Sequence, residues 1–205
     1  NKASLLEQYG IKDFDRPLIS YIHRLDPLQK GFQQFSEVIS DLVKDGAIII
    51  VHGQGDPSLE GFETIEKKLN DLRDQFPNNI ILETGYYKDS IAQKILAASD
   101  IHITPSRFEP GGYSNLHAMV FGNVPIVTPT GGLIDAVQSF NSASGIANGF
   151  VTKDFSAESL RSTTLQALGI YKNNHNLFTS MQTRSMVTTP THIDMAKKYN
   201  QIYQL

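Results

Sequence analysis

The chain has 205 residues, of which 40% are hydrophobic and 19% are charged, and it contains no cysteine. This composition excludes a disordered or fibrous protein, and the lack of thiols excludes disulfides, cysteine metal ligands and a cysteine nucleophile. The net charge of −3 argues against a nucleic-acid-binding surface spread over the protein, and no apolar run reaches the roughly 20 residues of a membrane-spanning helix.

Short apolar runs alternate with amphipathic stretches along the chain. The apolar runs predict buried strands at 18–23, 47–52, 80–83, 101–104, 124–128 and 150–152. The amphipathic stretches predict helices at 32–43, 59–76, 89–98, 114–121 and 156–168, with a further helix after the turn at 131–132 and two more segments near the C-terminus. Asp89 is the expected cap of its helix.

This alternation indicates an α/β fold with a Rossmann-like, doubly wound parallel sheet. A TIM barrel is a poorer fit because it needs eight strand–helix units and about 250 residues. Residues 141–149 are expected to form a polar loop. The stretch 173–192 carries a single charge, Arg184. It is expected to form a loosely packed helix that normally packs against another structure.

Candidate site residues follow the first two predicted strands, because ligands of open parallel sheets bind outside the carboxyl ends of the strands. Arg24 and Lys30 follow the first strand and are suited to hold a phosphate at the start of the next helix. Gly53 opens a tight Gly-Gln-Gly-Asp-Pro turn after the second strand. This turn lets a ligand approach the backbone, although it is a poor dinucleotide fingerprint.

The densest signal is the segment 104–116, which runs from the end of a strand into a helix. Glu109 is the one carboxylate there, and it is better placed to accept hydrogen bonds from sugar hydroxyls than to meet phosphates. Gly111 and Gly112 leave room for a phosphate, and Ser114 is a candidate helix cap. The turn Thr130-Gly131-Gly132 repeats this pattern after the next strand.

The segments PSRFEPGGYSNL and GNVPIVTPTGGLIDAV resemble the nucleotide-binding half of bacterial glycogen synthases and plant starch synthases. Further segments, among them YIHRLDPLQKG and HGQGDPSLE, resemble the same family in the same order along nearly the whole chain. Those proteins are retaining glucosyltransferases of the two-domain GT-B architecture. The resemblance therefore implies the C-terminal, nucleotide-sugar-binding domain of such an enzyme.

The resemblance implies a donor, ADP-glucose or UDP-glucose, and a role for each residue of the motifs. Arg24 and Lys30 would pair with its phosphates and Glu109 would hold hydroxyls of the transferred glucose, with no metal or other cofactor required. The remaining substrate-binding residues implied in this way are Gly53, Tyr86 (which would stack on the base), Gly111, Gly112, Tyr113, Ser114, Asn115, Thr130 and Gly131.

Two positions and one segment depart from the wider pattern. His117 stands where many retaining GT-B enzymes have a second glutamate, a change that glycogen synthases commonly share. Gly111 stands where the family often has cysteine. The sequence at 189–192, Thr-Pro-Thr-His, replaces a usual Asp-Phe-Ser-Trp.

The resemblance also predicts the organisation of the protein. Residues 1–190 would form the nucleotide-sugar-binding domain, and residues 191–205 a helix that crosses back toward an N-terminal domain missing from this sequence. That missing domain would bring the α-glucan acceptor. Since the first residue is Asn1 rather than methionine, the chain is expected to be part of a longer protein and to transfer little glucose alone. The expected location is the cytoplasm, or a plastid in a plant.

Two other functions stay open from the sequence. One is another retaining GT-B glycosyltransferase with a different nucleotide sugar, and the other is a non-catalytic module that binds nucleotide sugars. A dehydrogenase is a distant alternative, because the first strand is not followed by a glycine fingerprint. The histidines show no metal-binding pattern, and no nucleic-acid or membrane partner is expected.

Overall fold

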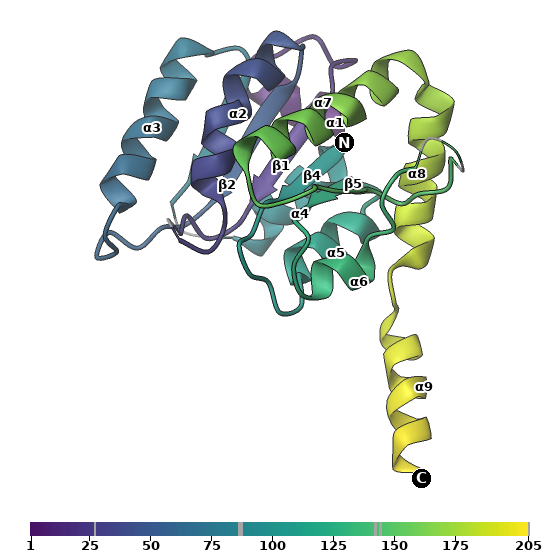
Figure 1. The fold of residues 1–205 in the computed structure, drawn as a ribbon. Helices are drawn as coiled ribbons and strands as arrows, with labels where there is room; N and C mark the ends of the chain where they lie inside the picture. The colour runs from purple at the N-terminus through teal and green to yellow at the C-terminus, as the bar shows by residue number, and fades with distance from the viewer. Residues whose placement is uncertain (27, 86–87, 142, 144, 205) are drawn as a thin grey trace.

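The computed structural model describes residues 1–26, 28–85, 88–141, 143 and 145–204 (Figure 1). Six strands form one parallel sheet in the order β3-β2-β1-β4-β5-β6. The strands are β1 (Leu18–Ile22), β2 (Ile48–Gly53), β3 (Ile80–Thr84), β4 (Ile101–Thr104), β5 (Val124–Val127) and β6 (Phe150–Val151). The chain winds outward from β1 in one direction and from β4 in the other, which confirms the predicted doubly wound sheet.

Helices cover both faces of the sheet (Figure 1). One face carries α2 (Phe32–Lys44), α3 (Phe62–Gln75) and α7 (Ala157–Asn173). The other carries α1 (Lys2–Gln8), α4 (Asp89–Ala98), α5 (Tyr113–Val120) and α6 (Gly132–Ala136). The chain then runs through α8 (His175–Thr188) into α9 (His192–Tyr203).

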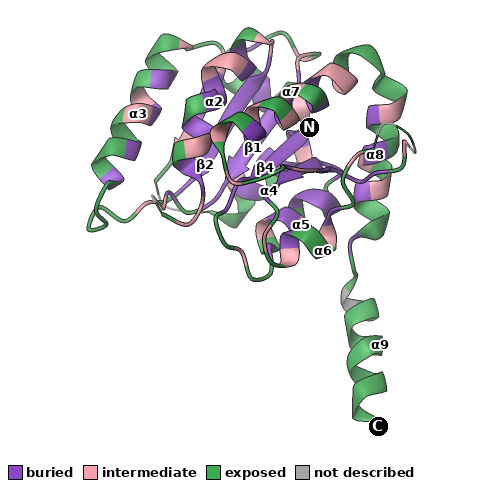
Figure 2. Cartoon of the chain, in the orientation of Figure 1, coloured by how far each residue is buried: buried purple, intermediate pink, exposed green. Residues whose placement is uncertain are grey.

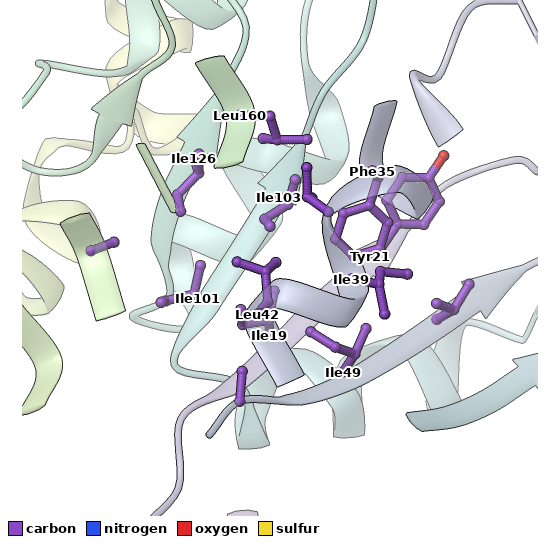
Figure 3. Close-up of a cluster of buried hydrophobic side chains, with 14 of the residues drawn as sticks. Ile19, Tyr21, Phe35, Ile39, Leu42, Ile49, Ile101, Ile103, Ile126 and Leu160 are labelled. Atoms are coloured by element: carbon purple, nitrogen blue, oxygen red, sulfur yellow. The ribbon is translucent and has the colours of Figure 1, made fainter. Parts of the chain in front are cut away.

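The central strands are buried on both faces, as their largely apolar sequences predict (Figure 2). Successive side chains of a strand point to opposite faces, so Tyr21 packs against α2 while Ile22 joins the cluster under α1 and α4. The Tyr21 ring stacks on Phe35 with centroids 5.0 Å apart (Figure 3). This packing fixes the end of β1, from which the candidate site begins.

Three predicted helix starts are wrong in detail. Helix α3 begins at Phe62 rather than near residue 59, because Gly61 in the left-handed conformation ends a turn there. The residue that precedes α4 is Lys88, so Asp89 lies in the first turn and is not the cap. Gly112 precedes α5, and the Ser114 hydroxyl contacts another part of the molecule.

The expectation of a loosely packed segment at 173–192 is also wrong. Helix α8 buries Phe178 and Met181 completely in the main core, where they join residues of β5 and α7. The hydroxyl of Ser185, also buried, donates a hydrogen bond to the Asn123 carbonyl over 2.8 Å. The segment has few charges because one face of its helix packs into the core.

Helix α9 projects from the body of the molecule (Figures 1 and 2). Thr191 and Asp194 form a capping box at its start. Ile193, Tyr199 and Ile202 each expose about 60% or more of their surface. Among the described residues, no helix combines the length and the apolar character needed to cross a lipid bilayer.

Candidate functional site

A cleft of about 840 Å³ opens at the carboxyl ends of the neighbouring strands β1 and β4, after which the chain continues toward opposite edges of the sheet. Its walls come from the loops that follow β1 and β2, and from the loop and helix that follow β4. Five residues predicted from the sequence line it together: Arg24, Lys30, Glu109, Tyr113 and Ser114. This is the position in which doubly wound sheets bind ligands.

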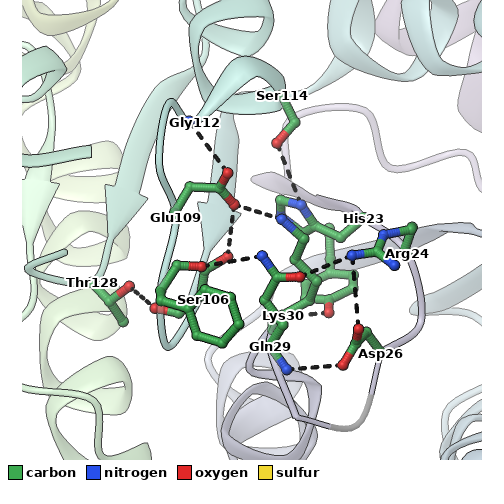
Figure 4. A network of polar contacts seen from close by, with 12 residues as sticks. His23, Arg24, Asp26, Gln29, Lys30, Ser106, Glu109, Gly112, Ser114 and Thr128 are labelled. Atoms are coloured by element: carbon green, nitrogen blue, oxygen red, sulfur yellow. Dashed lines mark hydrogen bonds and ion pairs between the residues drawn. The ribbon is translucent and has the colours of Figure 1, made fainter. Parts of the chain in front are cut away.

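Lys30 and Glu109 form an ion pair inside this cleft (Figure 4). The Lys30 Nζ lies 2.5 Å from Glu109 Oε2, and the two side chains expose only 13% and 12% of their surface. The Ser106 hydroxyl and the Gly112 N–H also donate to the carboxylate, each over 3.3 Å. Burial alone would raise the pKa of Glu109, but these donors lower the pKa below its usual value. Glu109 is therefore an ionised carboxylate at neutral pH.

Two backbone contacts hold the loop after β1 against the loop after β4. Gly31 has a φ of +65°, and a Cβ at this position would lie 1.8 Å from the Pro105 carbonyl oxygen, so only glycine permits the approach. The Arg107 N–H donates to the Gln29 carbonyl over 2.8 Å. Tyr21 adds a hydrogen bond from its hydroxyl to the Lys30 carbonyl over 3.1 Å. Lys30 and Glu109 meet because their loops are fixed in this way.

Arg24 lies at the mouth of the cleft with 66% of its side chain exposed. Its guanidinium donates to Gln29 Oε1 over 2.8 Å and lies 3.8 Å from the Asp26 carboxylate. Burial acts to raise the pKa of Asp26, but the N–H groups of Gln29 and Leu28 and the two nearby cations lower it overall. The mouth therefore presents the Arg24 cation to solvent beside the ionised Asp26.

His23 was not among the predicted site residues, although it directly follows β1. Its Nε2 lies 2.9 Å from the Ile103 carbonyl oxygen, which can only accept, so this nitrogen carries the ring proton. Nδ1 of the neutral ring then accepts from the Ser114 hydroxyl over 3.4 Å. Burial lowers the pKa of His23 to about 4, with Lys30 adding to the effect and the Ile103 carbonyl and Glu109 opposing it.

Glycines shape the backbone around this network. Gly131 has a φ of +46°, and a Cβ there would lie 2.1 Å from the Glu109 carbonyl oxygen. The N–H of Gly132 donates to the same carbonyl over 3.2 Å. Gly53 lies directly against the backbone of His23, where a Cβ would lie 1.8 Å from the carbonyl oxygen. Gly53 and Gly131 thus pack against the backbone of the site residues His23 and Glu109.

The remaining predicted residues lie around the cleft rather than inside it. Gly111 lines a smaller neighbouring cleft, and Thr130 is half-buried in the turn before α6. Asn115 is fully buried and its Nδ2 lies 3.4 Å from the Met119 sulfur, so its side chain points into the body. Tyr86 falls outside the described residues.

His117 is exposed on the second turn of α5. Its ring lies 4.2 Å, centroid to centroid, from the ring of Tyr113, which is 69% exposed. The two aromatic side chains stand together beside the mouth of the cleft. In the part of the chain that the structure describes, no group of three or more histidine, aspartate or glutamate side chains could hold a metal ion.

The family model described as "Glycosyl transferases group 1" matches residues 6–180. The chain belongs to this family. The match includes all the strands and the cleft with Arg24, Lys30 and Glu109. The fold is therefore that of a glycosyltransferase domain, as the motifs predicted.

Glycogen synthases are among the relatives of the chain. It is 37% identical to the glycogen synthase of Clostridium novyi and 34% identical to that of Streptococcus sanguinis. These matches cover 99% and 100% of the chain but 41% of each relative. The chain thus spans about two fifths of the length of these curated relatives.

Solved glycosyltransferase structures share the fold. The catalytic domain of starch synthase IV from Arabidopsis thaliana, bound to ADP and acarbose, superimposes with a TM-score of 0.86 and 27% identity. The match covers 99% of this chain and 41% of that one. HepE of Anabaena, in complex with UDP, superimposes with a TM-score of 0.71 at 17% identity over 99% of this chain and 52% of that one. At that identity the likeness shows the fold alone.

Proposed function

We propose that the chain is the donor-binding domain of a glycogen or starch synthase. The whole enzyme would transfer glucose from ADP-glucose or UDP-glucose to the non-reducing end of an α-1,4-glucan, with retention of configuration. The glycogen synthase relatives, which match along almost the entire chain, support this function. The ADP-bound starch synthase IV domain, which matches at a TM-score of 0.86, supports a nucleotide-sugar donor.

The meeting of Arg24, Lys30 and Glu109 in one cleft is the observation that carries the proposal. Negative charge grows on the departing diphosphate as the bond between the glucose and the phosphate breaks. Two cations held in a partly buried site stabilise this charge. Lys30 would turn from Glu109 toward the phosphates, and the Glu109 oxygens would accept hydrogen bonds from glucose hydroxyls.

The helix start beside Glu109 completes the proposed donor site. The backbone N–H groups of Tyr113 and Ser114 lie in the first turn of α5, where N–H groups have no partner within the helix and attract anions. Gly111 and Gly112 leave space for the donor beside this turn. The other residues proposed for the donor site are Gly53, Asn115, Thr130 and Gly131, which surround the cleft, and Tyr86, which would stack on the nucleobase.

The acceptor glucan would bind to an N-terminal domain across the cleft, as in other two-domain enzymes of this architecture. Helix α9 would cross to that domain and bury Ile193, Tyr199 and Ile202, which are exposed in this structure. The chain alone would then bind the donor through residues 1–190 and transfer little glucose. The proposed compartment is the cytoplasm, or a plastid in a plant.

Calorimetric titration of the chain with ADP, UDP, ADP-glucose and UDP-glucose tests the proposal. Either the adenine or the uracil nucleotides should bind more tightly. Within that pair, the nucleotide-glucose should bind more tightly than the free nucleoside diphosphate. The Glu109→Gln variant should lose that gain in affinity, while its affinity for the free diphosphate should not fall, because the substitution weakens the glucose contacts and frees Lys30 from its ion pair. No binding of any of the four nucleotides would contradict the proposed function.

A further inference from the structure

The side-chain amide of Gln29 bridges the two loops that carry the site. Its Oε1 accepts from the Arg24 guanidinium over 2.8 Å, and its Nε2 donates to the Phe108 carbonyl over 3.3 Å (Figure 4). A guanidinium can only donate and a carbonyl can only accept, so a flipped amide would lose both bonds. The orientation of the amide is therefore fixed by its partners.

The backbone of Gln29 is held on both sides as well. Its N–H donates to Asp26 Oδ1 over 2.9 Å, within its own loop. Its carbonyl accepts from the Arg107 N–H over 2.8 Å, from the loop after β4. The side chain of Gln29 thus extends from a backbone that is attached to the segment bearing Glu109.

Arg24 needs such a support more than the other charged groups of the cleft. Its side chain is 66% exposed, and the Asp26 carboxylate lies 3.8 Å away, beyond hydrogen-bond distance. Within the described residues, the hydrogen bond that holds the guanidinium is the one to Gln29. A long, exposed side chain that must become ordered on binding reduces affinity, and an intramolecular support removes part of that cost.

We infer that Gln29 is a positioning residue that holds Arg24 over the diphosphate site and couples it to the loop of Glu109. This inference rests on the proposed function. A neutral amide suits the task because it directs the guanidinium without cancelling its charge. A carboxylate at this position would form an ion pair with Arg24 and compete with the phosphates for it.

A double-mutant cycle on the chain tests the inference. The probe is whichever of ADP and UDP binds the unsubstituted chain more tightly. Gln29→Met keeps the length of the side chain and removes its hydrogen bonds, so it should weaken diphosphate binding by about three- to tenfold. In an Arg24→Ala background the same substitution should change the affinity by less than about twofold, because Gln29 then has no guanidinium to position. Gln33→Met, at an exposed glutamine on α2, is the matched control.

A second variant separates positioning from support of the fold. Gln29→Glu should weaken binding more than Gln29→Met, whereas a purely structural role predicts losses that follow the melting temperature. Equal losses from Gln29→Met with and without Arg24 would overturn the inference and leave the proposed function standing. If the unsubstituted chain binds neither diphosphate, the proposed function is contradicted and the role of Gln29 with it.

Discussion

Lys30 donates to Glu109 across the point where the strand order reverses, over 2.5 Å. One residue belongs to the half of the sheet that winds from β1 and the other to the half that winds from β4. The pair therefore joins the two halves at the position where a ligand would bind. The contribution of this ion pair to the stability of the fold and the binding of a phosphate in its place can be measured separately.

Lys30→Met should lower the free energy of unfolding by about 1–3 kcal/mol, because it leaves a largely buried carboxylate without its cation. Adding Glu109→Gln should recover part of this loss, since the unpaired charge is then gone. Urea unfolding of the two single variants and the double variant measures the coupling. Lys12→Met at an exposed lysine is the control, and strictly additive effects would show that the ion pair has no energetic role.

The stability of the chain should fall on acidification, in part because of His23. An unfolded histidine takes up a proton below about pH 6.5, whereas burial holds the pKa of His23 at about 4 in the folded chain. Between these values the unfolded state binds the extra proton, so the free energy of unfolding decreases as the pH falls. His23→Gln should reduce this slope by about 1.4 kcal/mol per pH unit.

Unfolding curves of the parent chain and of His23→Gln between pH 4 and 8 measure that slope. Above pH 7 the two stabilities should differ by a constant amount, because His23 is neutral in both states there. Identical slopes for the two proteins below pH 6 would contradict the assignment of a buried, neutral imidazole to His23.

Gly131→Ala should disrupt the site through the backbone of Glu109. The added Cβ would lie 2.1 Å from the Glu109 carbonyl oxygen, in addition to the cost of a φ of +46°. We expect a loss of at least about 2 kcal/mol in stability and a large loss of diphosphate affinity. Gly10→Ala shares the positive φ but meets no atom within 4 Å. It should cost about 1 kcal/mol and leave binding unchanged, and matching losses from both variants would refute the contact.

Phe178→Ala should destabilise the fold by about 3–5 kcal/mol, because it removes a fully buried aromatic ring from the main core. Val187→Ala on the exposed face of the same helix, at 74% exposure, should change the stability by less than about 0.5 kcal/mol. Thermal and urea unfolding check both values. A small effect of Phe178→Ala would restore the expectation of a loosely packed segment.

The strands and the placement of the charged residues could be predicted from the sequence. Buried strands of a parallel sheet are continuous apolar runs, and ligand-binding residues directly follow them, so Arg24 and Glu109 were identifiable. The tight packing of helix α8 could not be predicted, because a segment with few charges is compatible with loose packing as well as with a buried face. Its partners, such as Asn123, lie far away in the sequence.

The side-chain network within the site could not be predicted in the same way. The ion pair of Lys30 and Glu109 joins residues 79 positions apart, and the contact of Gly31 with Pro105 that sets it up is a matter of backbone geometry. His23 and Gln29 are polar residues of common type, and their roles come from the atoms that surround them. Asp26, three residues before Gln29, is a local signal of an ordered turn.

Titration of a nucleoside diphosphate into the chain and into Arg24→Ala tests the central claim most directly. If the cleft at the carboxyl ends of β1 and β4 binds the phosphates through its cations, Arg24→Ala should weaken binding by at least about tenfold, which corresponds to about 1.4 kcal/mol. Arg73→Ala, at an exposed arginine of α3 that pairs with its neighbour Asp74, should leave the affinity unchanged. Undiminished binding of the diphosphate by Arg24→Ala would contradict the account.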